Sequence, residues 1–190
     1  PIFAAGLEIE GMGTLYLDFL TWDGMADTEF GQPTSTKSLL WRKAWVNGVD
    51  HWEWWSGEPF RLVKDEGRGM ASIGTREWND YRFSAVVRPA FLAEAGGVAV
   101  NVQGMQRFYA LQMRRGSVQL VKVLDGTRVL AEKPLAFELW QEIVLSLQTA
   151  VQRTPTGGEA VRLVAQVDGK TVFDVVDGER PLLSGSAALV

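Results

Sequence analysis

Tryptophan is the residue type in this chain best suited to binding chemistry, because an indole ring can stack on the apolar face of a sugar. The chain has 190 residues and eight tryptophans, and five of these lie close together: Trp41, Trp45, Trp52, Trp54 and Trp55. In a strand, Trp52 and Trp54 share one side and Trp55 takes the other, so all three cannot face one ligand. Two interpretations stay open for this run: a ligand platform, or aromatic residues of the core that cover an open end of the domain.

Few residues are suited to nucleophilic or acid–base catalysis. The only histidine, His51, has Asp50 and Glu53 close by in sequence, but no G-x-S-x-G motif supplies a nucleophilic serine. Retaining glycosidases place two carboxyl groups about 5–5.5 Å apart. Apart from acids in loops, only Glu8 and Glu10 have the alternate spacing that a strand would need. We expect these two acids to be solvated at a strand edge, and the sequence predicts no catalytic residue.

Oxygen ligands are the only metal-binding chemistry that the acidic residues suggest. The chain has no cysteine, which excludes disulfides and thiolate metal sites. Asp23, Asp27 and Glu29 are spaced like calcium ligands, and so are Asp65 and Glu66, but neither group has the register of an EF-hand loop. We therefore predict no metal ligand and no cofactor, and keep a structural calcium ion as an alternative.

Charge and hydropathy exclude two classes of partner. The net charge is −4 at pH 7 and the isoelectric point is about 5.1, whereas nucleic-acid binders usually carry a basic excess. No run of about 18 apolar residues is present, so the sequence predicts no membrane span. We expect no nucleic-acid partner.

Short segments that alternate apolar and polar residues dominate the rest of the chain, which is typical of half-buried strands. Residues 81–88, 98–103 and 107–114 follow this pattern. Their polar members can donate hydrogen bonds to sugar hydroxyls, or they are simply the outward side of half-solvated strands. We predict a ligand-binding set that joins these polar residues to the tryptophans: Trp52, Trp54, Trp55, Arg82, Asn101, Gln103, Gln112 and Arg114.

The spacing of the segments predicts the fold class. Residues 161–167 and 171–176 flank Asp168 and Gly169, a strong hairpin signal. Residues 140–151 fit both a strand and a helix, and we expect a strand because all their neighbours are strands. Many short strands with tight turns indicate an all-β fold, an antiparallel two-sheet β-sandwich of the jelly-roll type.

The N-terminal part of the chain differs from the rest, and it suggests a piece of a longer protein. Residues 1–22 resemble the last two strands of a preceding β-domain, residues 23–38 form a polar linker, and residues 39–190 form the sandwich. The start, PIFAAGLEIE, echoes the end, PLLSGSAALV. Because an open sheet edge is a liability, we hypothesise that Thr14 to Leu20 completes the main sandwich.

Several motifs carry a family resemblance across about 150 residues: GTREWNDYRFSAVVRP, GGVAVNVQGMQRFYALQM, SVQLVKV, RVLAE and VRLVAQVDGKTVFDVVDG. In this order they resemble the concanavalin A-like lectin/glucanase (laminin-G-like) sandwich, as attached to some ADP-ribosylglycohydrolase family proteins. They are also similar to 3-keto-disaccharide hydrolase-type domains. The resemblance implies that Trp78 and Trp140 belong to the core and that one concave sheet often binds ligand.

The resemblance and the residues together suggest three functions. The first is a non-catalytic module that binds a carbohydrate or glycoconjugate and serves as an accessory domain of a larger hydrolase-type protein, with other domains of that chain as partners. The second is a glycoside-cleaving enzyme module of the 3-keto-disaccharide type. The third is a structural or dimerising domain. A shallow groove with exposed aromatic residues would favour binding, a deep acidic pocket would favour the enzyme, and a flat apolar patch would favour assembly.

Overall fold

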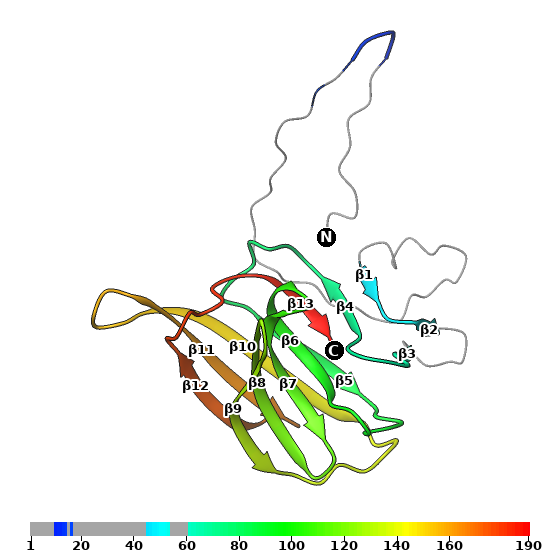
Figure 1. The fold of residues 1–190 in the computed structure, drawn as a ribbon, viewed down its shortest axis with the longest axis vertical. Coiled ribbons are helices and arrows are strands. Elements are labelled where there is room, and N and C mark those ends of the chain that lie inside the picture. The colour runs from blue at the N-terminus through cyan, green and yellow to red at the C-terminus, as the bar shows by residue number, and fades with distance from the viewer. Residues whose placement is uncertain (1–9, 15, 17–44, 54–60) are drawn as a thin grey trace.

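The computed structural model describes residues 10–14, 16, 45–53 and 61–190, and every regular element in these ranges is a strand. Two antiparallel sheets face each other as the two layers of a sandwich (Figure 1). The larger has the order β1-β4-β13-β6-β7-β8-β9, the smaller β12-β11-β10-β5, and β2 pairs with β3 beside them. The strands are β1 (Trp45–Gly48), β2 (His51–Glu53), β3 (Arg61–Val63), β4 (Met70–Ile73), β5 (Arg82–Val87), β6 (Gly96–Gly104), β7 (Arg107–Arg114), β8 (Ser117–Leu124), β9 (Thr127–Pro134), β10 (Ile143–Arg153), β11 (Glu159–Val167), β12 (Lys170–Asp177) and β13 (Ser186–Leu189).

The core lies between the two sheets and is built from the alternating apolar residues of the strands. Because successive side chains point to opposite faces, each strand delivers every second residue inward. Burying such side chains is the main favourable term in folding, at roughly 25 cal/mol per Å² of apolar surface. The largest inward residues include Tyr109, Leu111 and Leu120 from the larger sheet and Leu145, Leu147 and Leu163 from the smaller.

The predicted all-β sandwich is therefore confirmed, together with its clearest local elements. The ambiguous segment is a strand, β10, in which Leu145 and Leu147 are fully buried. Asp168 and Gly169 join β11 to β12 with φ values of 49° and 74°. Two positive φ values define a type I′ turn, whose twist matches that of the strands it connects.

One inward–outward assignment from the sequence is wrong, and a β-bulge explains it. The alternation in β6 predicts that Asn101 points away from the core, but the strand register shifts after Val100 and Asn101 has a φ of 51°. The extra residue of the bulge turns Asn101 inward, where it is fully buried. Asn101 Nδ2 donates to Thr149 Oγ1 (3.0 Å) and to the carbonyl of Leu182 (2.6 Å).

A second buried polar group links the sheets at β8 and β12. Lys122 Nζ lies 2.6 Å from Asp177 Oδ2 and also donates to the carbonyl of Arg180 at 2.9 Å. The hydroxyl of Tyr109 donates to the same carboxylate oxygen at 2.5 Å and accepts the N–H of Leu182. Buried charges are tolerated when they are paired and hydrogen-bonded, and this network meets both conditions.

The outer face of the larger sheet is divided into an apolar end and a polar end. Near the β6–β7 turn, a second buried cluster contains Phe108, Val123 and Met70, and the guanidinium of Arg68 lies 5.2 Å from the Phe108 ring centroid. Towards the β7–β8 turn, at the lower end of the sandwich in Figure 1, the same face carries polar side chains. This second end offers several neighbouring groups for recognising a polar ligand.

The expectations for the N-terminal part fall mostly outside the described residues. These are the closing strands of 1–22, the linker of 23–38 and the edge-filling role of residues 14–20. The described strands run from Trp45 to Leu189. No helix in the described part of the chain is long and apolar enough to span a membrane.

Candidate functional site

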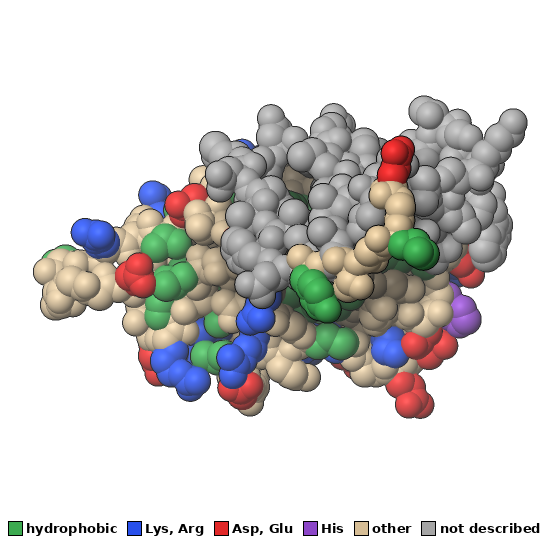
Figure 2. Space-filling model, turned by 90° about the horizontal axis from the view of Figure 1, so that it is seen from above, with side chains coloured by type: hydrophobic (Ala, Val, Ile, Leu, Met, Phe, Trp, Pro, Cys, Tyr) green, Lys and Arg blue, Asp and Glu red, His purple; other side chains and the backbone are tan. Residues whose placement is uncertain are grey.

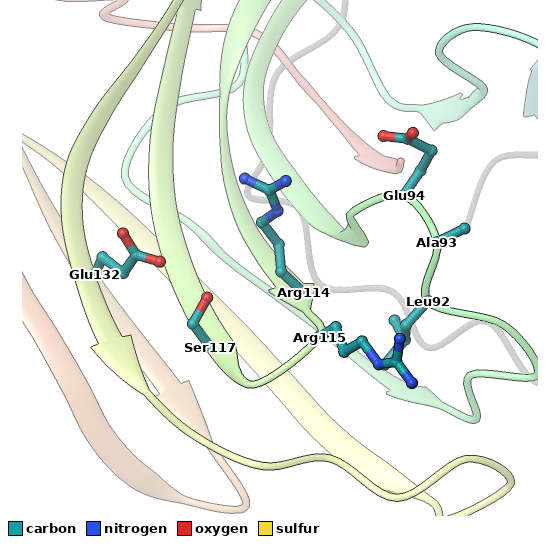
Figure 3. A pocket seen from close by; sticks show the side chains of 7 residues that line it. All are labelled: Leu92, Ala93, Glu94, Arg114, Arg115, Ser117 and Glu132. Atoms are coloured by element: carbon teal, nitrogen blue, oxygen red, sulfur yellow. The ribbon is translucent and has the colours of Figure 1, made fainter.

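A polar hollow of about 270 Å³ lies at the lower end of the larger sheet's outer face. Figure 3 shows Arg114, Ser117 and Glu132 rising from three neighbouring strands, with Glu94 on the loop beyond Arg114. The volume is slightly below the roughly 300–1,000 Å³ of pockets for drug-sized ligands, so it suits one small polar unit. We call this site the polar hollow; its lining residues are Leu92, Ala93, Glu94, Arg114, Arg115, Ser117 and Glu132.

Strand register places the polar side chains of the hollow in rows. Gln112 of β7 pairs with Gln119 of β8, which pairs with Glu132 of β9. In the next row, Arg114 pairs with Ser117. Side chains directly opposite on one face have Cβ atoms about 4.5–5.5 Å apart, so these groups form one continuous polar surface.

Glu132 is the electrostatic centre of this surface. Hydrogen bonds from the side chains of Gln119 and Ser117, followed by the positive charge of Arg114, hold the pKa of the Glu132 carboxyl below its ordinary value. Hydrogen bonds to the charged form of a carboxyl favour that form. Glu132 is therefore an ionised acceptor at neutral pH, beside a guanidinium that can only donate.

Three loops meet at this end of the sandwich, and two of them line the polar hollow. The N–H of Leu135, just after β9, donates to the carbonyl of Gly116 in the β7–β8 turn (3.0 Å), and the N–H of Trp140 donates to the carbonyl of Pro89 (2.8 Å). The segment that follows β9 is thus bound to both the β7–β8 turn and the loop before β6. Both contacts continue strand pairs of the sheets, since Pro134 pairs with Ser117 and Ile143 pairs with Val87.

The structure brings only part of the predicted ligand-binding set to this site. Arg114 lines the hollow and Gln112 lies in the adjoining polar row. Arg82 lies on the other sheet, where its guanidinium donates to Gln148 Oε1 at 2.8 Å. Gln103 is half-buried and donates to the carbonyl of Ser184. The predicted polar residues therefore belong to separate surfaces rather than to one concave face.

The remaining predicted residues are buried or fall outside the described part of the chain. Asn101 is buried in the core, where its amide donates to the carbonyl of Leu182 and is out of reach of a ligand. Trp52 is buried and packs edge-to-face on Trp45, with ring centroids 5.8 Å apart, which agrees with the core interpretation for this residue. Trp54 and Trp55 lie outside the described residues.

The two tryptophans expected in the core behave differently. Trp78 is half-buried and meets the Tyr81 ring edge-to-face at 5.8 Å. Trp140 is 60% exposed, so its expected core position is wrong. Its place in a loop after β9, with a φ of 67°, turns it outward.

The polar groups near His51 lie at the surface and contact one another. His51 Nε2 lies 3.6 Å from Asp65 Oδ2, and Lys64 Nζ lies 2.7 Å from Asp50 Oδ1. In Figure 2 the histidine is the purple side chain at the surface, with acidic and basic side chains nearby. Within the described ranges, no group of three or more His, Asp or Glu side chains could hold a metal ion. Asp23, Asp27 and Glu29 lie outside those ranges.

Sequence reasoning missed Glu132, Ser117, Gln119 and Glu94 as members of the site. A usable signal was present for three of them, because Ser117 and Gln119 are outward positions of an alternating strand and Glu132 follows a two-residue turn that sets β9 beside them. Glu94 lies in a loop, whose path no periodicity predicts.

One solved structure with a similar fold is a carbohydrate-binding module, CBM66 from Bacillus subtilis. The two chains are 13% identical, with a TM-score of 0.59, and the match covers 77% of this chain and 86% of that chain. An identity this low shows a shared fold and nothing finer. No family model and no curated protein matches the chain.

Proposed function

We propose that this domain is a non-catalytic module that binds carbohydrate, and that the polar hollow is its binding site. The observation that carries the proposal is that a carboxyl group, Glu132, and a guanidinium, Arg114, line the same open hollow. A sugar hydroxyl can donate to the carboxylate and accept from the guanidinium at the same time, and hydrogen bonds to ionised groups are the stronger ones. The fold shared with a carbohydrate-binding module supports the same function.

The charges of the hollow favour a neutral sugar. Two basic residues, Arg114 and Arg115, are matched by two acidic ones, Glu94 and Glu132. Because the formal charges of the lining residues cancel, the hollow gives no net attraction to a negatively charged sugar such as a uronic acid or a sugar phosphate. We therefore expect neutral, hydroxyl-rich ligands.

The lowered pKa of Glu132 does not fit the general acid of a glycosidase. A glycosidase needs one carboxyl that keeps its proton near neutral pH, which requires a raised pKa. The pKa of Glu132 is lowered instead, which suits an acceptor of hydroxyl hydrogens.

The proposed role is that of an accessory module in a larger hydrolase-type protein. The family of that protein, ADP-ribosylglycohydrolase, is proposed on the sequence resemblance alone.

Calorimetric titration with neutral saccharides tests this proposal. Glu132→Gln keeps the shape of the side chain but removes its charge, and Arg114→Ala removes the donor. Losing a hydrogen bond to a charged group costs about 1.5–3 kcal/mol, so each variant should bind roughly ten- to a hundredfold more weakly.

Two matched variants serve as controls. Glu159→Gln at the start of β11 and Arg153→Ala at the end of β10 change exposed residues of the same types outside the hollow, and both should bind as the unaltered chain does. Equal affinity in all five proteins would refute the assignment of the site.

A further inference from the structure

Two aromatic side chains are exposed in the loops at the same end of the sandwich as the polar hollow. Phe91 is 80% exposed and Trp140 is 60% exposed. Large aromatic residues are usually well buried, because they offer more apolar surface than most other side chains. We call Phe91 and Trp140 the aromatic rim.

The aromatic rim is continuous with the polar hollow through the backbone. Phe91 directly precedes Leu92, Ala93 and Glu94, which line the hollow. Trp140 is tied to the same loop by its hydrogen bond to the Pro89 carbonyl. The two aromatic residues therefore lie in connected loops, one of which also lines the hollow.

The backbone of Trp140 gives an independent reason to assign a function to the rim. Its φ of 67° is in the left-handed region, which a bulky residue rarely adopts. Such conformations persist where the surrounding structure enforces them, and they cluster at binding sites. Here the left-handed position holds a tryptophan that is more than half exposed, so burial offsets only part of the strain.

We propose that the aromatic rim is a second subsite, which stacks on the further sugar units of a glycan whose first unit lies in the polar hollow. This inference rests on the proposed function and narrows its ligand to an oligosaccharide. The C–H faces of pyranose and furanose rings are apolar and pack on aromatic rings, while their hydroxyl edges need the hollow. The two surfaces together match the two kinds of surface on a glycan.

Chain length of the ligand is the variable that tests the inference. Neutral monosaccharides and tetrasaccharides built from glucose, mannose, galactose or fructose would be titrated into the unaltered chain, Trp140→Ala and Phe91→Ala. A stacking contact adds about 0.5–1.5 kcal/mol. Each variant should therefore bind the preferred tetrasaccharide about two- to tenfold more weakly, with unchanged affinity for the matching monosaccharide. Tyr16→Ala, which removes another highly exposed aromatic ring, is the control.

The possible results distinguish a failure of the second subsite from a failure of the proposed function. Unchanged tetrasaccharide binding in both rim variants would overturn the second subsite while leaving the hollow in place. If the unaltered chain binds no saccharide of either length, the proposed function fails and the subsite fails with it. Sedimentation of the same proteins tests the remaining possibility, which is that a second copy of the chain binds to the aromatic rim. A dimer that only the rim variants dissociate, with glycan binding unchanged, would assign the rim to self-association and overturn the proposal.

Discussion

At the scale of single residues, Asn101 joins three segments of the chain from inside the sandwich. Its amide contacts Thr149 of the smaller sheet and the carbonyl of Leu182, and its own N–H donates to the hydroxyl of Tyr81. That hydroxyl also contacts the carbonyl of Ser186 at 2.8 Å. A buried acceptor left without its donor costs about 1–3 kcal/mol.

We therefore expect Asn101→Ala to lower the free energy of unfolding by about 2–4 kcal/mol, since it removes two buried hydrogen bonds. The reference is Arg82→Ala, a polar residue on an exposed strand face, which should change stability by less than about 0.5 kcal/mol. Urea denaturation of both variants measures the difference. Similar midpoints for the two would show that the amide of Asn101 does not hold the bulge.

Asp177 adds a dependence of stability on pH. Burial alone would raise the pKa of its carboxyl, but hydrogen bonds from Lys122, Tyr109 and the N–H of Glu179 hold the pKa below the ordinary value of 3.8. A carboxyl with a lower pKa in the folded state contributes stability that is complete above the unfolded-state pKa. That stability is lost as the pH falls through the folded-state pKa.

The unaltered chain should therefore lose stability below about pH 4, and Asp177→Asn should show less of this acid-dependent loss. At pH 7 the same variant should be less stable by about 3–5 kcal/mol, because Lys122 is left buried without its counter-ion. Denaturation curves at pH 7, 5 and 3 separate the two effects. Parallel losses in both proteins below pH 4 would exclude Asp177 as the titrating group.

Residue roles were the least predictable from the sequence, for a physical reason. Arg82, Asn101 and Gln112 all sit at polar positions of alternating strands, yet they lie on the outer face of one sheet, in the core and on the outer face of the other. Alternation tells which residues share a face of one strand. It does not tell which sheet the strand joins or where a bulge reverses the order.

At the scale of elements, the contact between β6 and its neighbours depends on a glycine. A Cβ at Gly97 would lie 2.0 Å from the carbonyl oxygen of Leu111 in β7. Gly97 also exchanges two backbone hydrogen bonds with Val190, at the end of β13. The pairing of β13, β6 and β7 at the lower end therefore has no space for a side chain at this position.

Gly97→Ala should consequently destabilise the fold by at least about 1–3 kcal/mol, the cost of overpacking. Gly126→Ala in the β8–β9 turn is the matched control, because a Cβ there meets nothing within 4 Å, and it should be neutral or slightly stabilising. Thermal unfolding compares the two substitutions. Equal melting temperatures would mean that β6 and β7 can separate to admit the methyl group.

The strands and tight hairpins were predictable from the sequence, whereas the order of the strands within each sheet was not. The Asp168-Gly169 turn is a local signal that correctly indicated β11 and β12, whereas the β10 segment fitted both a strand and a helix and was expected to be a strand because its neighbours are strands. The insertion of β13 between β4 and β6 joins segments that lie far apart in sequence. No local pattern encodes such a pairing.

At the scale of the whole molecule, the two ends of the larger sheet's outer face differ in polarity and exposure. The outer face of the larger sheet is apolar and buried near the β6–β7 turn, and it is polar and open near the β7–β8 turn. The loops with Phe91 and Trp140 meet at the open end. This division gives one surface that can recognise hydroxyl groups and apolar ring faces together.

The most direct test of this account maps glycan binding onto the fold by amide NMR. A ¹⁵N-labelled chain would be titrated with the neutral tetrasaccharides. The account predicts saturable shifts that centre on Arg114, Ser117 and Glu132, extend to Phe91 and Trp140, and spare Arg82 and Ser84 on the smaller sheet. Shifts centred on the outer face of the smaller sheet, or no shifts with any glycan at millimolar concentration, would contradict it.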